Sequence, residues 1–195
     1  GMKSDTRNQR WLVYDLGGGT FDIAVVSTKD GRLSVLEHRG NNMLGGKDFD
    51  RLIVERIILP RLEKSFNLSF LNDSVTSNRR LIQILRGKAE EAKIDLSRAD
   101  RVLISIFDCG EDKDGKPIEA EFEITSSEFN RLIEPSIAKT VDLCKQALTQ
   151  ARLTPADVAT VILVGGPTNT PYIREMLSTE LGVSLDYSVD PMTIV

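Results

Sequence analysis

The chain has 195 residues, 41% hydrophobic and 28% charged, and its 29 acidic residues outnumber 25 basic ones for a formal net charge of −4. This composition is typical of one globular domain or two small ones, and it excludes a disordered chain and a collagen-like repeat. The acidic balance argues against nucleic acid as a partner. No apolar run approaches the ~20 residues of a membrane-spanning helix, and the polar start is not a signal peptide, so we expect a soluble, cytoplasmic protein with no membrane partner.

The two cysteines and the chain ends do not indicate a functional site. Cys109 and Cys144 are far apart in the sequence, form no CxxC pair and have one histidine, His38, to share a metal with, which predicts free core thiols and no zinc site. His38 itself is expected to be a surface or otherwise satisfied side chain. Gly1 precedes Met2, as a residue left by tag removal does, and the chain stops in the apolar run 192–195, so we expect part of a longer protein.

The first third of the chain predicts an antiparallel meander followed by a helix. The three strands of the meander are 11–15, 21–28 and 33–37. Glycines 17–19 make its first turn, and Asp30-Gly31 is a typical hairpin turn. From Lys47 onward apolar residues recur at helical spacing, and Pro60 should kink or end that helix.

The middle of the chain predicts a surface connection, a helix and a hairpin. Residues 67–79 are rich in Asn and Ser, which is typical of a connection. The helix over 79–97 has one apolar stripe, formed by Leu81, Leu85, Ala89, Ala92 and Leu96. Strands at 102–107 and 118–124 flank a polar turn and form the hairpin.

The last third predicts a long helix, a buried strand and a second helix. Residues 125–128, TSSE, form a capping box that opens the long helix. Strand 160–164 is apolar throughout, as a central strand is, and Thr170, Pro171 and Gly182 delimit the last helix. The whole pattern predicts an α/β fold: a mixed layer from residues 8–44 and 126–195, with a smaller α/β insertion at 45–125.

The strongest chemical signal is the segment DLGGGTFD at residues 15–22. Each glycine in a strand costs roughly 0.5–1 kcal/mol relative to alanine, so three in a row need a reason. Without Cβ atoms, successive N–H groups can converge on an anion, and a phosphate can approach the main chain. Asp15 and Asp22 suit Mg²⁺ or the orientation of a water, and Thr20 adds a hydroxyl donor. The alternative is a glycine bulge at a sheet edge, but the flanking acids favour a phosphate and metal site.

Two weaker signals lie further along the chain. Glu90, Lys93 and Ser97 share one helix face, which could contact a ligand with hydroxyls and ring nitrogens; a solvated face with a Glu–Lys pair explains the same pattern. Gly165-Gly166 lies between a buried strand and a helix, which suits either the close approach of a ligand or a tight turn.

Taken together, these segments resemble the nucleotide-binding domain of the seventy-kilodalton heat-shock chaperones, the DnaK type. The matching segments are LVYDLGGGTFD at 12–22, LGGKDFD at 44–50, AEEAK at 89–93 with Leu96-Ser97, and ILVGG at 162–166. Their order and spacing cover nearly the whole chain, from about residue 11 to 191.

The resemblance implies a ribonuclease-H-like fold of the actin, hexokinase and heat-shock chaperone ATPase type, in which two lobes close over a nucleotide. This chain looks like the second lobe. It would have a phosphate-binding core subdomain with a mixed sheet (8–44 and 126–195) and an inserted small α/β subdomain facing adenosine (45–125).

The resemblance also implies roles in binding ATP or ADP with Mg²⁺. Asp15 and Asp22 would be the catalytic acids, near the attacking water and the Mg²⁺, which Asp15 would hold through water. Residues placed at the nucleotide are Gly17, Gly18, Gly19 and Thr20 at the phosphates, Glu90, Lys93 and Ser97 at ribose and adenine, Gly165 and Gly166 behind the nucleotide, and also Gly45, Gly46 and Asn169.

The function that the resemblance implies is that of a molecular chaperone whose intact form hydrolyses ATP to drive folding cycles. Its partners would be unfolded client peptides, a J-domain co-chaperone and a nucleotide exchange factor. A complete cleft would need a second phosphate hairpin of the DxGT type, and the sequence contains no DxGT segment. Only one wall of the cleft is therefore encoded here, and we expect negligible hydrolysis by the isolated chain.

Several positions depart from the family pattern. Ile94 and Asn169 stand where the family has arginines that stack on adenine, and an arginine over a ring contributes roughly 0.5–2 kcal/mol. We therefore predict adenine binding weakened about 5-fold to several hundredfold, with tolerance for other bases. Asn41 and Lys47 replace acids, and Pro167 replaces a polar residue.

Two alternatives remain at this point. The altered adenine positions favour a divergent docking module with weak or vestigial nucleotide binding, whereas the intact acids and glycines oppose it. A sugar kinase or actin-like filament protein of the same superfamily is the other, and the LGGKDFD and AEEAK segments argue against it.

Overall fold

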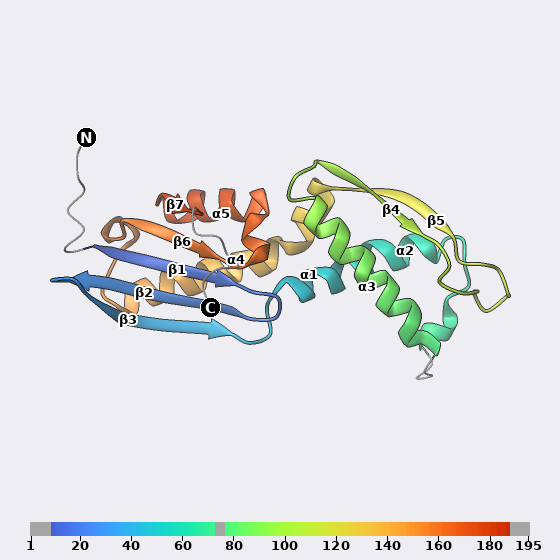
Figure 1. Ribbon diagram of the computed structural model, residues 1–195, viewed down its shortest axis with the longest axis horizontal. Helices are drawn as coiled ribbons and strands as arrows, with labels where there is room; N and C mark the ends of the chain where they lie inside the picture. The colour runs from blue at the N-terminus through green and yellow to red at the C-terminus, as the bar shows by residue number, and fades with distance from the viewer. Residues whose placement is uncertain (1–8, 73–76, 188–195) are drawn as a thin grey trace. The chain divides into compact units, whose positions relative to one another are not determined.

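Figure 1 shows a computed structural model of the chain, which describes residues 9–72 and 77–187. Within these ranges, no helix has the length and apolar character needed to cross a membrane. The chain divides into two compact units, residues 1–46 with 135–195 and residues 47–134. Each unit is described in turn.

The first unit contains a five-stranded sheet (Figure 1). In sheet order its strands are β3 (Arg32–Asn41), β2 (Phe21–Lys29), β1 (Arg10–Leu16), β6 (Thr160–Val164) and β7 (Leu185–Asp186). β1, β2 and β3 are antiparallel neighbours, which confirms the predicted meander, whereas β6 pairs in parallel with both β1 and β7. The sheet is therefore mixed, and β6 lies inside it as its apolar sequence predicts.

The two faces of β1 differ in burial. Leu12, Tyr14 and Leu16 are buried, and the Tyr14 hydroxyl lies 2.7 Å from Oγ1 of Thr140 on α4 (Ser126–Gln150). The C-terminal half of α4 thus covers this face. Asp15 points to the other face, which is only half-buried, because successive strand residues alternate between faces. An acid at this position stays within reach of solvent and of a ligand.

An extra residue interrupts the pairing of β2 with β3. Val26 is opposite Val35, but Val25 is opposite Glu37, so Leu36 has no partner across the ladder. Such a β-bulge changes which β3 side chains share a face with β2 from that point on, because side chains alternate with a period of two. Beyond the bulge, Asp22 is opposite Gly40.

Three helical segments complete the first unit: η4 (Pro155–Asp157), η5 (Gly166–Asn169) and α5 (Pro171–Leu181). Thr170 and Gly182 flank α5 as predicted, and Gly182 ends it in the left-handed region at φ 63°. Thr170 occupies the predicted N-cap position, but its side chain makes no capping hydrogen bond.

The second unit begins with one helical stretch that corrects a prediction. α1 (Gly46–Ile53) runs through a π-helical turn, η2 (Val54–Ile58), into α2 (Leu59–Leu62). Pro60 therefore does not end the helix. It lies in the first turn of α2, directly after the π turn, where the change of hydrogen-bond register already leaves N–H groups without an α-helical partner.

The rest of the second unit follows the sequence pattern closely. It comprises η3 (Ser69–Asn72), α3 (Ser77–Asp95), the hairpin of β4 (Arg101–Ile106) and β5 (Ala120–Thr125), and the start of α4. The five predicted stripe residues of the 79–97 helix are all buried. In the expected connection 67–79, Leu68 is buried and residues 73–76 lie outside the described ranges. Thr125 and Glu128 exchange the hydrogen bonds of the predicted capping box.

Candidate functional site

The glycine turn between β1 and β2 is closed by its own backbone. The N–H of Gly17 donates to the carbonyl oxygen of Thr20 over 2.9 Å. Gly18 and Gly19 form the exposed tip, and a Cβ built on either would meet no atom within 4 Å. The tip therefore presents bare backbone to open space, which is the arrangement in which an anion can approach N–H groups directly.

A second glycine pair packs on this turn. A Cβ at Gly45 would lie 2.5 Å from the nitrogen of Gly19 and 2.6 Å from the carbonyl carbon of Gly18. The N–H of Gly46 donates to the carbonyl oxygen of Gly17 over 2.9 Å. Since no side chain fits between these two backbones, Gly45 is required for the turn to sit where it does.

A third glycine segment closes against the end of β1. Gly165 has φ 93°, and a Cβ there would overlap the carbonyl group of Leu16. β6 runs parallel to β1 with Val164 paired to Asp15, so both strands end at the same edge of the sheet. Three glycine segments far apart in the sequence thus meet within the first unit, at the end of β1.

The two acids predicted from the sequence lie side by side. Asp15 and Asp22 are directly opposite each other across β1 and β2, and cross-strand partners share a face. Burial, and then the negative charge of Asp22, raise the pKa of Asp15. A cation between or beside the two carboxylates would relieve that repulsion.

The donor set fits Mg²⁺ bound together with a phosphate. Within residues 9–72 and 77–187, no group of three or more His, Cys, Asp or Glu side chains could form a metal cage. Mg²⁺ does not need one, because it usually takes one or two carboxylates and completes its shell with waters and phosphate oxygens. Asp15 and Asp22 beside an open glycine turn meet that requirement.

The η5 turn carries Asn169, and Arg174 on α5 holds this side chain. The guanidinium donates through Nη2 to Oδ1 of Asn169 and through Nε to the carbonyl of Thr168, both over 2.8 Å. It also lies 4.5 Å above the ring of Tyr187. Arg174 could not be predicted from the sequence, because nothing in the local pattern distinguishes it from an ordinary exposed helical arginine.

The three residues predicted to share a helix face lie in the second unit: Glu90 and Lys93 are on α3, whereas Ser97 lies in the turn after α3 ends at Asp95. Glu90 is exposed, and Ser97 donates its hydroxyl to the carbonyl of Ile94 over 2.6 Å. Nζ of Lys93 lies 2.7 Å from Oδ1 of Asp50 on α1, and these two side chains are 12% and 9% exposed. Burial raises the pKa of Asp50, and Lys93 opposes that rise. The predicted polar row therefore contains a largely buried ion pair.

His38 is a residue whose place the sequence did not reveal. Its Nε2 lies 3.4 Å from Oδ1 of Asp22. The side chain is exposed, as expected, and it lies beside Asp22, one of the two acids of the candidate site. The bulge at Leu36 decides this position, and a bulge leaves no clear signal in one sequence.

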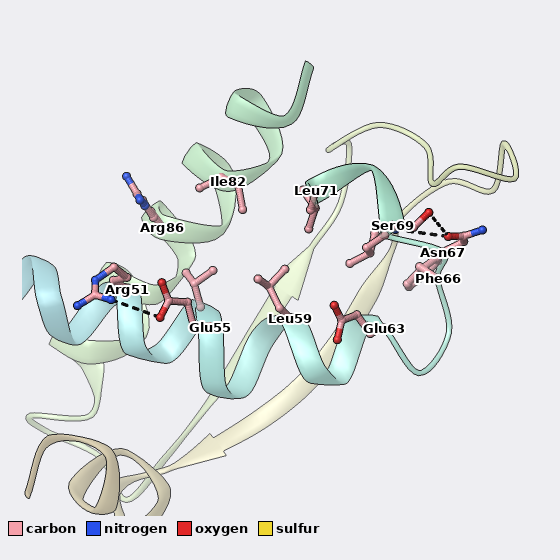
Figure 2. Close-up of a pocket in the computed structure, with 12 residues that line it drawn as sticks. Arg51, Glu55, Leu59, Glu63, Phe66, Asn67, Ser69, Leu71, Ile82 and Arg86 are labelled. Carbon is pink, nitrogen blue, oxygen red and sulfur yellow. Dashed lines mark hydrogen bonds and ion pairs between the residues drawn. The ribbon is translucent and has the colours of Figure 1, made fainter. Parts of the chain in front are cut away.

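A separate cavity of about 560 Å³ opens in the second unit between α3 and the helical stretch that includes α2 (Figure 2). At one end Arg51 pairs with Glu55 over 3.4 Å, and Leu59 and Ile82 line the middle. At the other end the hydroxyl of Ser69 donates a hydrogen bond to Oδ1 of Asn67. None of the residues predicted to contact nucleotide lines this cavity, so it is separate from the candidate site.

The family model described as Hsp70 protein matches residues 1–195 of the sequence.

Proposed function

This chain belongs to the Hsp70 family of 70-kDa heat-shock chaperones, and on that premise we propose that it binds the phosphates of ATP and ADP, with Mg²⁺, at the glycine turn. Its mixed sheet and mixed α/β content fit an actin-like ATPase lobe. More finely, we propose a ribonuclease-H-like second lobe, with residues 8–44 and 126–195 as the core subdomain and 45–125 as the small subdomain.

One observation carries the proposal: glycines from three distant segments converge on the end of β1, beside two opposed acids. Gly45 and Gly165 occupy positions where a Cβ would collide with backbone, so each is needed for the geometry itself. A Cβ at Gly18 or Gly19 would meet only open space, so packing within the chain does not require glycine there. Glycine at these two positions would instead let a ligand approach the backbone from outside. A phosphate would fit the bare backbone of the turn, and an accompanying Mg²⁺ would fit the two acids beside it.

The chemistry proposed for the intact protein is hydrolysis of the γ-phosphoryl group. Water attacks the γ-phosphorus in line as the bond to the bridging oxygen of ADP breaks, and catalysis is mainly positioning and charge stabilisation. Asp22 orients the water and accepts its proton, and the backbone N–H groups of the turn stabilise charge on the phosphate oxygens. Asp15 would hold Mg²⁺ through water, and the bound ion would supply positive charge to neutralise the phosphates.

From family membership we propose that Glu90, Lys93 and Ser97 contact ribose and adenine, and that Gly165, Gly166 and Asn169 also contact nucleotide. This part, the nucleoside end of the proposed site, rests on family membership. Because Ile94 and Asn169 provide no guanidinium, we propose that the base contributes little affinity and little selectivity.

In the intact protein the hydrolysis cycle would drive binding and release of unfolded client peptides. A J-domain co-chaperone and a nucleotide exchange factor would regulate it, and the cytoplasm would be its location. Family membership supports these roles in general terms. The alternative function is a docking module with vestigial nucleotide binding. Such a module would keep these partner contacts, and its function would not depend on Asp15.

Substitution of Asp15 tests the proposal. Asp15→Asn in the intact protein should lower the steady-state rate of ATP hydrolysis about 100-fold, since it removes the carboxylate that would hold Mg²⁺ through water. Asp30→Asn is the matched control, because Asp30 occupies the left-handed region in the β2–β3 turn, where Asn is equally accommodated. Wild-type rates in Asp15→Asn would contradict the proposed site and favour the docking module.

A further inference from the structure

β3 places a histidine beside the acid that the proposed function assigns to the attacking water. Nε2 of His38 lies 3.4 Å from Oδ1 of Asp22, and the side chains are 61% and 42% exposed. Asp22 is opposite Gly40, and Ala24 is opposite His38, so Asp22 and His38 are diagonal neighbours on one face of the sheet. Diagonal neighbours are close enough for long side chains to interact.

The β-bulge brings His38 to this face. Between the hairpin turn and the Val26–Val35 pair the ladder is regular, and its continuation would put Arg39 opposite Asp22 and turn His38 to the other face. The extra residue Leu36 shifts the pairing by one. Arg39 instead reaches Gln146 of α4, on the covered face. Bulges are over-represented beside functional sites because they redirect a side chain in this way.

Gly40 and Asp15 constrain the same carboxylate. A Cβ at Gly40 would lie 2.5 Å from Oδ1 of Asp22, so the carboxylate of Asp22 reaches over this glycine toward β3. On its other side stands the like-charged Asp15. Repulsion from Asp15 and attraction to an imidazole N–H of His38 both favour this position of Oδ1.

We propose that His38 is a positioning residue for Asp22. Its imidazole holds Oδ1 on the β3 side, so that the second carboxylate oxygen is presented to the water that attacks the γ-phosphorus. His38 itself contacts neither nucleotide nor water. The inference rests on the proposed function and adds a residue that sets the efficiency of the hydrolytic step.

Steady-state ATP hydrolysis by the intact protein tests this role. His38→Ala should lower kcat roughly 10-fold while KM stays within about 2-fold, because the water, and not nucleotide binding, loses its orientation. His38→Gln, whose amide can donate to the same oxygen, should recover part of the loss. Arg39→Ala, on the same strand but on the covered face, is the matched control and should leave kcat unchanged.

Asp22→Asn separates this inference from the proposed function. In an Asp22→Asn background, His38→Ala should have no further effect on kcat, because it acts through the carboxylate. If Asp22→Asn lowers kcat and His38→Ala does not, the role of His38 is overturned and the proposed function stands. If neither substitution lowers kcat, the role proposed for Asp22 fails and that of His38 fails with it.

The imidazole signal provides a readout independent of hydrolysis. His38 is the only histidine of this chain. In protein labelled with ¹⁵N-histidine, the ring signal that His38→Gln removes should shift when Asp22 is replaced by Asn. An unchanged ring signal would show that imidazole and carboxylate do not interact, and it would overturn the inference even if His38→Ala were less active.

Discussion

Nζ of Lys93 lies 2.7 Å from the carboxylate of Asp50, and this pair joins α3 to α1 inside the second unit. Both side chains are largely buried. Removing a charge from water costs several kcal/mol, and in a buried pair the mutual attraction offsets that cost only while both partners are present. The pair therefore makes the stability of this unit sensitive to the loss of either residue.

Lys93→Met should lower the free energy of unfolding by about 3–5 kcal/mol, because it leaves the Asp50 carboxylate without its buried partner. Urea denaturation followed by circular dichroism measures the change. Lys88→Met is the matched control on the same helix: Lys88 pairs with exposed Glu91 over 3.0 Å, and its loss should cost about 0–1 kcal/mol. Equal losses in the two variants would contradict a structural role of the Lys93–Asp50 pair.

The glycine turn and its acids could be predicted from the sequence because their geometry is local. DLGGGTFD lies within one hairpin, so the opposition of Asp15 and Asp22 follows from the pairing of two adjacent strands. The capping box at Thr125 and the helix end at Gly182 are equally local, and both occur as predicted. Such features depend on a few consecutive residues and on little else in the fold.

The remaining features depend on pairings or registers that one sequence does not specify. Lys93 and Asp50 are far apart in the chain, so helix periodicity shows the face of Lys93 but not its partner. The position of His38 depends on one extra residue, Leu36, and shifting a strand by one residue moves every later side chain to the other face. Pro60 was expected to kink or end the helix, but the helical stretch continues past it through α2. The π turn directly before α2, which periodicity does not reveal, already changes the hydrogen-bond register there.

The hydrogen bond between Tyr14 and Thr140 predicts an asymmetry between two substitutions. The Thr140 hydroxyl donates to the carbonyl of Ile137 over 2.7 Å, so the hydroxyl of Tyr14 donates to Oγ1 of Thr140. Tyr14→Phe removes a donor and leaves Thr140 bonded, which should cost about 0.5–1.5 kcal/mol. Thr140→Val leaves the fully buried Tyr14 hydroxyl without that acceptor, which should cost about 1–3 kcal/mol.

Chemical denaturation of both variants measures this asymmetry. Thr149→Val on the same helix is the control: its exposed hydroxyl donates to the carbonyl of Lys145, and its loss should change stability by less than about 0.5 kcal/mol. The account of the buried hydroxyl pair would be wrong if Tyr14→Phe proved the more damaging substitution.

Asp112 should make the second unit sensitive to acid. N–H groups of Asn67 and Lys116, and then that of Asp114, donate to its carboxylate and lower the pKa of Asp112. A carboxyl group with a lowered folded pKa stabilises the fold above its unfolded pKa of about 3.9, and this contribution is lost as pH falls through the folded value.

Asp112→Asn should therefore lower the urea midpoint near neutral pH, and its difference from wild type should shrink below about pH 4. Asp114→Asn is the matched control, because the exposed Asp114 carboxylate accepts from the side chain of Asn67 and, within the described residues, from no backbone N–H, so its effect should be smaller. A wild-type advantage that stays constant between neutral and acidic pH would exclude this carboxylate as the cause.

Ile94 provides a gain-of-function test of the proposed nucleoside end. It is 49% exposed near the end of α3, at a position where an arginine would stack on adenine according to the family resemblance. Ile94→Arg in the intact protein should raise the affinity for Mg·ADP about 2- to 30-fold, which corresponds to the roughly 0.5–2 kcal/mol of an arginine over a ring. Titration calorimetry with Mg·ADP and Mg·GDP measures both affinity and base preference. Gln83→Arg, an exposed position earlier on α3, adds the same charge and should change neither. Submicromolar binding of ATP with strong rejection of GTP by the unaltered protein would contradict the predicted loss of base recognition.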